Sequence, residues 1–374
     1  MNVAFDARYI EKEGSGVSVY ASNILKQFSS IKEINLHAII TQHQLDFLRL
    51  DKRIRTIISP YRIQDHPLQE IWFTFILPNI LKKNNIQILF CPGFIVPLKK
   101  PSFKIVAMIH DLAFHYVPFS MKKRFALYAS LMTSLVVKKS DFILTPTENV
   151  KNEMLQKYRI NAKNIYAVHH GKTLFQSGLS YSDRDSELFL QKMGIRQPYL
   201  LFVGNIEPRK DIVRLIDLFQ HLRTGKDFQQ YQLVLCGKKQ WKWNSIRPRI
   251  QDKMQNVIFT GYTPRQKLEM LYKKSEAVMA SSLYEGFGFP VIEGLQSEKV
   301  VFASDIPCFR EVCGDCAVFI NLGDRDTSAR TVMETLLDRR KKRELVEKGK
   351  AHLQKFSWKV CAENVLHVFQ AALQ

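Results

Sequence analysis

The sequence lacks a long uninterrupted apolar run. Its longest apolar stretch, residues 71–81, is shorter than the roughly 20 residues that span a bilayer, and it contains Pro78. Asp6 and Arg8 interrupt the first apolar residues, which argues against a secretory signal. We therefore expect a cytoplasmic protein that at most lies peripherally on the inner face of the cytoplasmic membrane.

Cysteine is scarce, and no low-complexity tract or internal repeat stands out. The 6 cysteines among 374 residues are scattered, which suits a reducing compartment. Cys313 and Cys316 form one CxxC pair with Cys308 nearby, but a structural zinc site needs a second pair and none is present. We predict no bound metal and no cofactor.

Acidic residues are outnumbered, and this points to an anionic partner. The chain carries 55 Lys and Arg against 35 Asp and Glu, a net charge of +20, and residues 1–175 are the more densely basic part. Nucleic acid, an acidic membrane surface and a phosphorylated ligand all fit such a charge. No finger, RNP motif or repeated aromatic–basic register is present, so a nucleic-acid-binding protein stays only as an alternative.

The order of apolar runs predicts two successive α/β domains. Near-continuous apolar runs separated by segments of helical period, such as 17–28 and 119–139, are typical of parallel sheets covered on both faces. A polar, turn-rich stretch at 177–187 reads as a linker, and charged helical segments at 324–355 and 357–373 close the chain. The expected strands are residues 3–7, 36–40, 54–58, 86–90, 104–110, 141–145 and 164–170, then 199–204, 231–237, 256–260, 276–280, 299–304 and 317–320.

The loop after the strand at 199–204 predicts a phosphate site. Gly204 ends the strand, Pro208 interrupts the loop, and Arg209 and Lys210 stand where a helix is expected to begin. The free N–H groups and dipole of a helix start favour an anion, and two cations beside them would hold a diphosphate.

The stretch "SLYEGFGFPVIEGLQ" (282–296) places two acids around a glycine-rich turn. Gly286 and Gly288 allow the backbone to approach a ligand, and the proline at 290 suits the first turn of a helix. Glu285 and Glu293 could accept hydrogen bonds from the hydroxyls of a sugar and a ribose. The arrangement predicts a sugar-nucleotide site.

Three further segments carry candidate residues. "EGSGVSVY" (13–20) is a Gly-Ser-Gly turn before a helix, and "KIVAMIHD" (104–111) ends a strand with His110 and Asp111, of which we favour His110 for a functional role. The apolar run at 121–139 has Lys and Arg at both ends. It is either a core helix of the first domain or a helix that lies on an anionic membrane.

Two Asp-Arg-Asp tripeptides, 183–185 and 324–326, lie in charged segments rather than at strand ends. We predict that they are surface or helix-capping residues and not a metal site.

Together these motifs resemble the retaining GT-B glycosyltransferases, specifically glycosyltransferase family 4. The resemblance covers nearly the whole chain and rests most specifically on the E-x7-E spacing from Glu285 to Glu293. Other matching stretches are "FDARYIEKEGSGVSVY" (5–20), "HDLAFH" (110–115), "VGNIEPRKD" (203–211), "VLCGKKQW" (234–241), "FTGYTP" (259–264) and "FSWKVCAENVLHVF" (356–369). The amino-terminal stretch is most similar to bacterial mannosyltransferases of surface polysaccharide assembly.

The resemblance implies two Rossmann-like, doubly wound parallel-sheet domains facing a central cleft. Residues 1–176 would bind the acceptor and residues 177–356 the nucleotide sugar, and a helix over 357–374 would cross back to the first domain.

The resemblance also implies roles for individual residues. The catalytic residues would be His110, Arg209, Lys210 and Glu285. The donor would be bound by Gly16, Gly204, Gly237, Lys238, Gly261, Tyr262, Gly286, Phe287, Gly288, Phe289 and Glu293. One departure is Gly294, where relatives often have alanine.

The implied reaction is the metal-independent, retaining transfer of a hexose from a nucleotide-diphospho-sugar. GDP-mannose is the favoured donor and a UDP-sugar the alternative, and the acceptor would be a saccharide or a lipid-linked saccharide. An epimerase-like enzyme of the same fold remains an alternative function.

Overall fold

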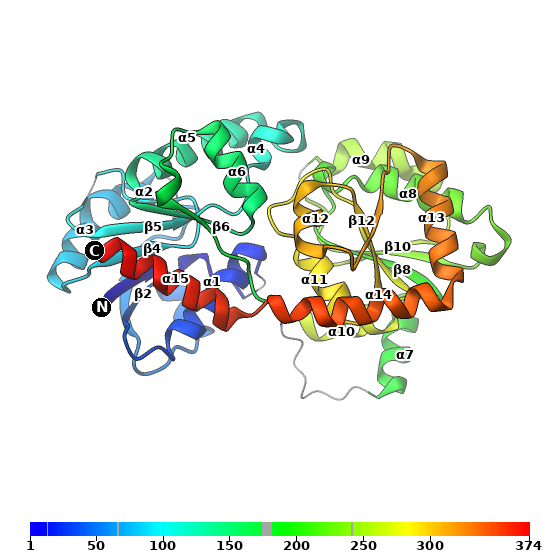
Figure 1. Ribbon diagram of the computed structural model, residues 1–374, viewed down its shortest axis with the longest axis horizontal. Coiled ribbons are helices and arrows are strands. Elements are labelled where there is room, and N and C mark those ends of the chain that lie inside the picture. Colours follow the sequence, from blue (N-terminus) through cyan, green and yellow to red (C-terminus); the bar gives the residue numbers. More distant parts are fainter. Residues whose placement is uncertain (13, 66, 100, 174–181, 241) are drawn as a thin grey trace. The chain divides into compact units, whose positions relative to one another are not determined.

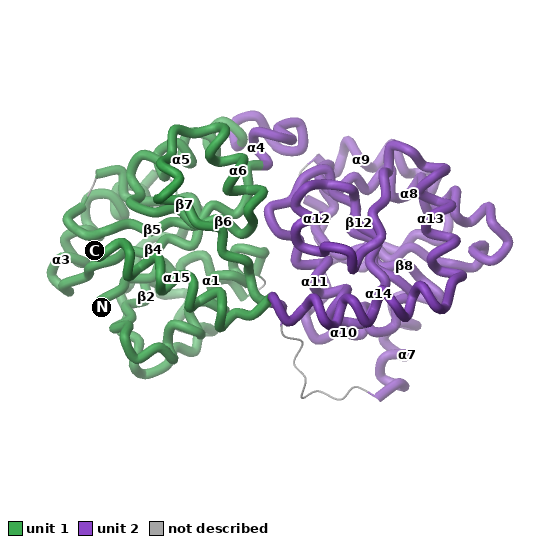
Figure 2. Tube along the Cα trace, in the orientation of Figure 1, with its two compact units in different colours: residues 1–112, 126–171, 356–374 green, residues 113–125, 172–355 purple. Residues whose placement is uncertain are grey.

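A computed structural model describes residues 1–12, 14–65, 67–99, 101–173, 182–240 and 242–374. The described chain divides into two compact units (Figure 2). Unit 1 comprises residues 1–112, 126–171 and 356–374, and unit 2 comprises residues 113–125 and 172–355. The chain therefore passes from one unit to the other four times, and the short segment 113–125 packs with unit 2 although unit 1 precedes and follows it.

Unit 1 is built on a seven-stranded parallel sheet of order β3-β2-β1-β4-β5-β6-β7 (Figure 1). Its strands are β1 (Asn2–Asp6), β2 (Asn35–Thr41), β3 (Arg55–Ser59), β4 (Ile88–Cys91), β5 (Lys104–Met108), β6 (Phe142–Thr145) and β7 (Ile165–Ala167). Its longer helices are α1 (Gly16–Phe28), α3 (Leu77–Lys83), α5 (Lys123–Lys139), α6 (Glu148–Lys157) and α15 (Trp358–Leu373). The first three residues of α5 are grouped with unit 2.

The apolar stretch at residues 71–81, in unit 1, is part of an irregular helix. It runs through α2 (Leu68–Ile71), the π-helical turn η3 (Trp72–Ile76) and α3, and Pro78 stands at the start of α3, where its missing N–H costs least. Further one-turn helices of this unit are η1 (Ala7–Tyr9), η2 (Gln42–Asp46) and η5 (Ala162–Asn164).

The carboxyl-terminal helix α15 completes the core of unit 1. The Phe369 ring lies 5.5 Å from the rings of both Phe28 on α1 and Phe90 on β4. Because these three side chains are fully buried, the last helix belongs to the core that the first helix and the central strands form.

Unit 2 holds a six-stranded parallel sheet of order β10-β9-β8-β11-β12-β13. Its strands are β8 (Tyr199–Val203), β9 (Gln232–Cys236), β10 (Val257–Gly261), β11 (Ala277–Ala280), β12 (Val300–Ser304) and β13 (Val318–Ile320). Its helices are α4 (Ala113–Tyr116), η4 (Pro118–Ser120), α7 (Asp183–Lys192), η6 (Pro208–Lys210), α8 (Ile212–Leu222), η7 (Lys226–Phe228), α9 (Trp243–Ile250), η8 (Gln251–Lys253), α10 (Arg265–Lys274), α11 (Phe289–Gln296), α12 (Pro307–Cys313), α13 (Arg325–Leu337), α14 (Arg339–His352) and η9 (Leu353–Lys355).

Alternating side chains of the unit 2 strands pack toward opposite faces. Phe202 and Leu235 join a core with α8, α9 and α13, whereas Val278 and Val301 lie against Gly294 of α11 on the other face. Figure 1 shows helices on both sides of this sheet. The doubly wound parallel architecture expected from the apolar runs is confirmed, and each expected strand is present to within a few residues.

Two details differ from expectation. The predicted linker 177–187 lies partly outside the described residues, and its later part is the start of α7. The helix expected at Arg209 and Lys210 begins only at Ile212, because the two cations belong to the one-turn helix η6 and Asp211 follows in a left-handed conformation (φ 48°).

Candidate functional site

The strand order of unit 2 alone indicates where a ligand would bind. From β8 the chain winds to one edge of the sheet through β9 and β10, and then returns to β11 on the other side of β8. The loops after β8 and β11 therefore leave neighbouring strands in opposite directions. In open parallel sheets, ligands bind at the carboxyl ends of the two strands where the order reverses.

The Arg209, Lys210 and Glu285 side chains meet at this point. Arg209 Nη1 donates to Glu285 Oε2 at 2.9 Å, and Lys210 Nζ donates to Glu285 Oε1. Arg209 also bonds Glu207, with Nη2 2.9 Å from its Oε1. The Ser282 hydroxyl donates to Glu285 Oε1 at 2.7 Å. Two cations and two carboxylates thus form one cluster across the two loops, which we call the Arg209 cluster.

The backbone ties the same loops together. The Leu283 N–H donates to the Arg209 carbonyl at 2.8 Å, and Arg209 Nη1 donates to the Tyr284 carbonyl at 3.2 Å. The Ser281 hydroxyl donates to the Lys210 carbonyl at 2.8 Å. The cluster is therefore held in a fixed arrangement by main-chain contacts as well as by charge.

The charges of the Arg209 cluster decide the ionisation of Glu285. Burial would raise the pKa of Glu285, but the positive charges of Arg209 and Lys210, with the hydrogen bonds from Lys210 and Ser282, lower it from 4.5 to about 2. Glu285 is a carboxylate at any physiological pH. Each of the two predicted diphosphate-binding cations is thus paired with a carboxylate, Arg209 with Glu207 and Glu285, and Lys210 with Glu285.

Glu293 lies on α11 in a different environment. The Tyr272 hydroxyl donates to its Oε2 at 2.8 Å and the Thr173 hydroxyl to its Oε1 at 3.1 Å, while Arg265 Nη2 lies 3.5 Å away. Burial raises the pKa of Glu293, opposed by the Arg265 charge and the two hydroxyls. The carboxyl group is held by hydroxyl donors, the kind of group that a ribose would also offer.

The turn between the two acids is built for close packing. Gly288 has φ 94° and caps α11, and a Cβ added to it would lie 2.5 Å from the Phe309 ring. Gly286 is buried, and the Phe287 and Phe289 rings contact each other at 5.3 Å. Pro290 stands in the first turn of α11, as expected.

Three glycines line the carboxyl edge of the sheet beside this turn. Gly204, Gly237 and Gly261 stand at the ends of the adjacent strands β8, β9 and β10. A Cβ on Gly237 would lie 1.9 Å from the Gly204 carbonyl oxygen, so the two strand ends approach more closely than any side chain allows. Next to them Lys238 Nζ lies 4.8 Å from the Tyr262 ring centroid, and the Tyr262 side chain is 42 % exposed.

Gly16 and His110 belong to unit 1, whereas the other predicted residues belong to unit 2. Gly16 is the first residue of α1, and Tyr20 on the same helix packs edge-on against the His110 ring at 5.1 Å. His110 Nε2 lies 2.7 Å from the Pro92 carbonyl and so carries the proton in that bond. Burial lowers the pKa of His110, which keeps the ring neutral.

Sequence reasoning missed four residues of the site in unit 2. Glu207, Thr173, Arg265 and Tyr272 all hold the predicted residues through the contacts given above. Of these four, only Glu207 could have been predicted from the sequence, because it directly precedes the Pro-Arg-Lys run. The others are brought to α11 by the fold.

Both Asp-Arg-Asp tripeptides stand at helix starts. Asp185 accepts from the Ser182 hydroxyl at 2.6 Å in a capping box of α7, and Asp324 accepts from the Thr327 N–H at the start of α13. Asp185 and Asp324 are therefore capping residues, in agreement with the prediction that the tripeptides hold surface or helix-capping residues. Within the described ranges, no group of three or more His, Cys, Asp or Glu side chains could hold a metal ion.

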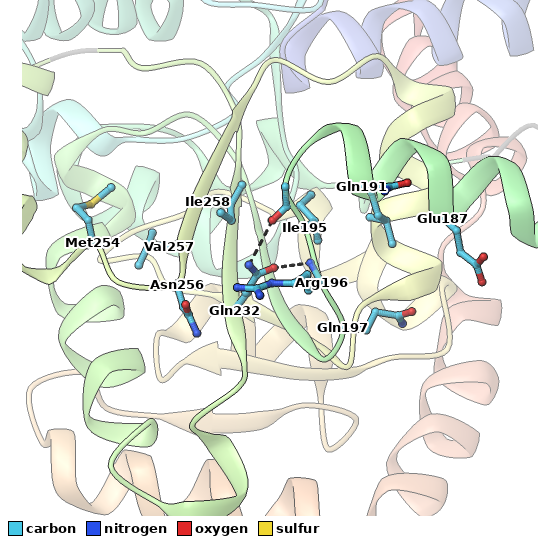
Figure 3. A pocket seen from close by; sticks show the side chains of 12 residues that line it. Glu187, Gln191, Ile195, Arg196, Gln197, Gln232, Met254, Asn256, Val257 and Ile258 are labelled. Carbon is cyan, nitrogen blue, oxygen red and sulfur yellow. Dashed lines mark hydrogen bonds between the residues drawn. The ribbon is translucent and has the colours of Figure 1, made fainter.

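A pocket of about 600 Å³ lies at the opposite, amino-terminal edge of the unit 2 sheet (Figure 3). The Gln232 side chain accepts from the Arg196 N–H at 2.5 Å and donates to the Gly194 carbonyl at 3.3 Å. Its amide is thus used to fix the turn before β8. The residues that line this pocket do not include those of the Arg209 cluster.

Two models of glycosyltransferase families match this sequence. Residues 185–352 match the model of "Glycosyl transferases group 1" and residues 14–172 that of "Glycosyltransferase Family 4". The chain belongs to the group 1 glycosyltransferases of family 4, with the GT-B fold. It is therefore an enzyme of a retaining glycosyltransferase family.

The curated relatives are distant. The O-antigen chain mannosyltransferase B of Escherichia coli is 25 % identical over 332 residues, which cover 87 % of this chain and 82 % of that protein. The O-antigen chain mannosyltransferase RfbU of Salmonella typhimurium is 24 % identical and covers 84 % and 85 %. Sucrose-phosphate synthase from Thermosynechococcus elongatus shares the fold with a TM-score of 0.78 at 16 % identity, covering 100 % and 99 % of the two chains.

Proposed function

We propose that this glycosyltransferase moves a hexose, with mannose favoured, from a nucleotide-diphospho-sugar to a saccharide or lipid-linked saccharide during surface polysaccharide synthesis. The Arg209 cluster at the junction of β8 and β11 is the observation that carries the proposal. The names of the relatives, both O-antigen mannosyltransferases, support mannose and a surface polysaccharide.

The diphosphate is placed beside the Arg209 cluster in this proposal. When the glycosyl–phosphate bond breaks, the electron pair stays on the leaving phosphate oxygen and positive charge develops at the anomeric carbon. Arg209, Lys210 and the N–H groups of the turn before α11 stabilise the leaving diphosphate. Preorganised donors of this kind contribute roughly 3–4 kcal/mol each.

The carboxylates hold the two ends of the donor. Glu285, ionised beside the cations, accepts hydroxyl hydrogen bonds from the transferred sugar, and Glu293 accepts those of the ribose in exchange for Thr173 or Tyr272. His110 is assigned to the transferred sugar, and Tyr262 and Lys238 border the base. The acceptor hydroxyl attacks from the face that the diphosphate leaves, and its proton passes to the leaving oxygen.

A panel of nucleotide sugars tests this proposal. Purified protein is incubated with GDP-mannose, UDP-glucose and UDP-N-acetylglucosamine, and released nucleoside diphosphate is measured with and without EDTA. We expect GDP from GDP-mannose at the same rate in both buffers. Preferred turnover of a UDP-sugar contradicts mannose, and a loss of activity in EDTA that manganese restores contradicts metal independence.

We also propose that unit 1 contacts an anionic membrane through α5. No helix within the described ranges is long and apolar enough to cross a bilayer. On α5, Leu127 and Leu131 are 73 % and 59 % exposed, and Lys123 and Arg124 at its start are also exposed. An apolar stripe flanked by cations is typical of helices that lie in the headgroup region.

The neighbouring helical stretch widens this apolar surface. The Tyr128 hydroxyl on α5 donates to Glu70 Oε1 on α2 at 3.2 Å, so the two helices lie side by side. Ile71 on α2 and Phe75 on η3 are both largely exposed. Such a surface would give access to a lipid-linked acceptor.

A further inference from the structure

The segment 113–125 packs on the site of unit 2. The Tyr116 ring stacks on the Tyr284 ring, with centroids 5.3 Å apart and planes inclined by 6°. Lys242 Nζ donates to the Phe119 carbonyl at 2.5 Å, and η4 packs against η6, the turn that carries Arg209 and Lys210. The segment therefore touches both loops that form the Arg209 cluster.

Tyr284 connects this stack to the acid beside it. Its ring is buried under Tyr116, its carbonyl accepts from Arg209, and the next residue is Glu285. The Glu285 carboxylate accepts hydrogen bonds from the side chains of Arg209, Lys210 and Ser282. Fixing the Tyr284 ring consequently fixes the main chain from which the Glu285 side chain projects.

We infer that Tyr116 is a positioning residue for the transfer reaction, which acts through Tyr284 to aim the Glu285 carboxylate. The inference rests on the proposed role of Glu285 at the transferred sugar. Tyr116 is 39 % exposed and contributes little to the unit 2 core. Its stacking geometry matches one of the favoured arrangements of aromatic pairs.

The test compares three variants. Tyr116→Phe keeps the stacked ring, Tyr116→Leu keeps an apolar side chain without a flat ring, and Tyr116→Ala removes the contact. Phe119→Ala is the matched control, because the Phe119 side chain is exposed and its carbonyl bond to Lys242 remains. For each protein, kcat for the donor that the wild type uses and the Kd of the matching nucleoside diphosphate are measured, with a melting curve to establish folding.

We expect Tyr116→Ala and Tyr116→Leu to lower kcat by about two- to twelve-fold, the range set by the energy of an aromatic stack. The Kd of the nucleoside diphosphate should not change, because that ligand has no sugar for Glu285 to contact. Tyr116→Phe and Phe119→Ala should match the wild type.

Wild-type kcat in both Tyr116→Ala and Tyr116→Leu overturns the inference. An equal loss of kcat and nucleotide affinity also overturns it, because the stack would then support the fold in general. A lowered kcat in Tyr116→Phe overturns it as well. If the wild type turns over no nucleotide sugar, the proposed function fails instead, and that result is separate because it is read from the wild type.

Discussion

Glu285 and Glu293 are both buried acids of the E-x7-E motif, yet their partners differ. Glu285 faces two cations, and Glu293 faces two hydroxyls and a more distant guanidinium. Glu285→Gln should lower kcat by at least about ten-fold with little change in nucleoside diphosphate affinity. Glu293→Gln should weaken the binding of donor and free nucleotide alike, because a ribose contact is lost. Calorimetry with the nucleoside diphosphate beside steady-state kinetics separates the two, and equal effects on its affinity would refute the assignment.

The ionisation of Glu285 also makes a prediction about stability. Its pKa is lowered from 4.5 to about 2 in the folded protein, so its stabilising contribution is complete above pH 4.5 and is lost as the pH falls from there toward 2. The wild type should have a higher Tm than Glu285→Gln at pH 6, and the difference should shrink toward zero near pH 2.

A matched control for this titration is Glu334→Gln, since Glu334 is exposed on α13. Its Tm should follow that of the wild type throughout. A Tm difference for Glu285→Gln that stays constant between pH 6 and pH 2 would contradict the ion pairing described for Glu285.

At the scale of elements, the glycines at the ends of β9 and β10 differ in how much room they leave for a side chain. Gly237 and Gly261 both have positive φ, but a Cβ on Gly237 meets the Gly204 carbonyl oxygen whereas a Cβ on Gly261 meets open space. Gly237→Ala should lower the free energy of unfolding by about 1–3 kcal/mol more than Gly261→Ala. Chemical denaturation measures both, and equal losses would mean that the strand ends can separate.

The helix α5 gives the element-scale test of membrane contact. Binding to anionic vesicles in a sedimentation assay should fall with salt and with the change of Lys122, Lys123 and Arg124 to Glu. The control changes Arg339, Arg340 and Arg343 on α14 to Glu, which alters the net charge equally on a different helix. If the wild type stays in the supernatant at low salt, the membrane proposal is wrong.

The elements were largely predictable because their signals are local. An apolar run such as 199–204 indicates a strand that is buried on both faces of a parallel sheet. A proline such as Pro290 indicates the start of a helix. The linker prediction at 177–187 overlooked the capping box at Ser182 and Asp185, which starts α7 within a polar stretch. Polarity alone does not distinguish a capped, exposed helix from a loop.

At the scale of the whole molecule, the contacts of the candidate residues could not be predicted from the sequence. The spacing of Glu285 and Glu293 indicated a candidate site, but nothing local indicates that Glu285 pairs with Arg209 and Lys210, which lie about 75 positions earlier. Likewise, Tyr272 and Arg265 on α10 lie close to Glu293 on α11, and no local motif indicates these contacts. Contacts between distant segments follow from the order of strands in the sheet, which no single motif encodes.

The four passages of the chain between the units have a consequence for fragments. A cut after Gly171 leaves the segment 113–125 with the first fragment and α15 with the second, so each fragment carries an arm that completes the other. Fragments 1–171 and 172–374 should therefore associate by reciprocal exchange of arms and co-purify when they are expressed together. Phe369→Asp, which places a charge between Phe28 and Phe90, should weaken that association. In that case, each fragment would need a segment of the other fragment to complete its own unit.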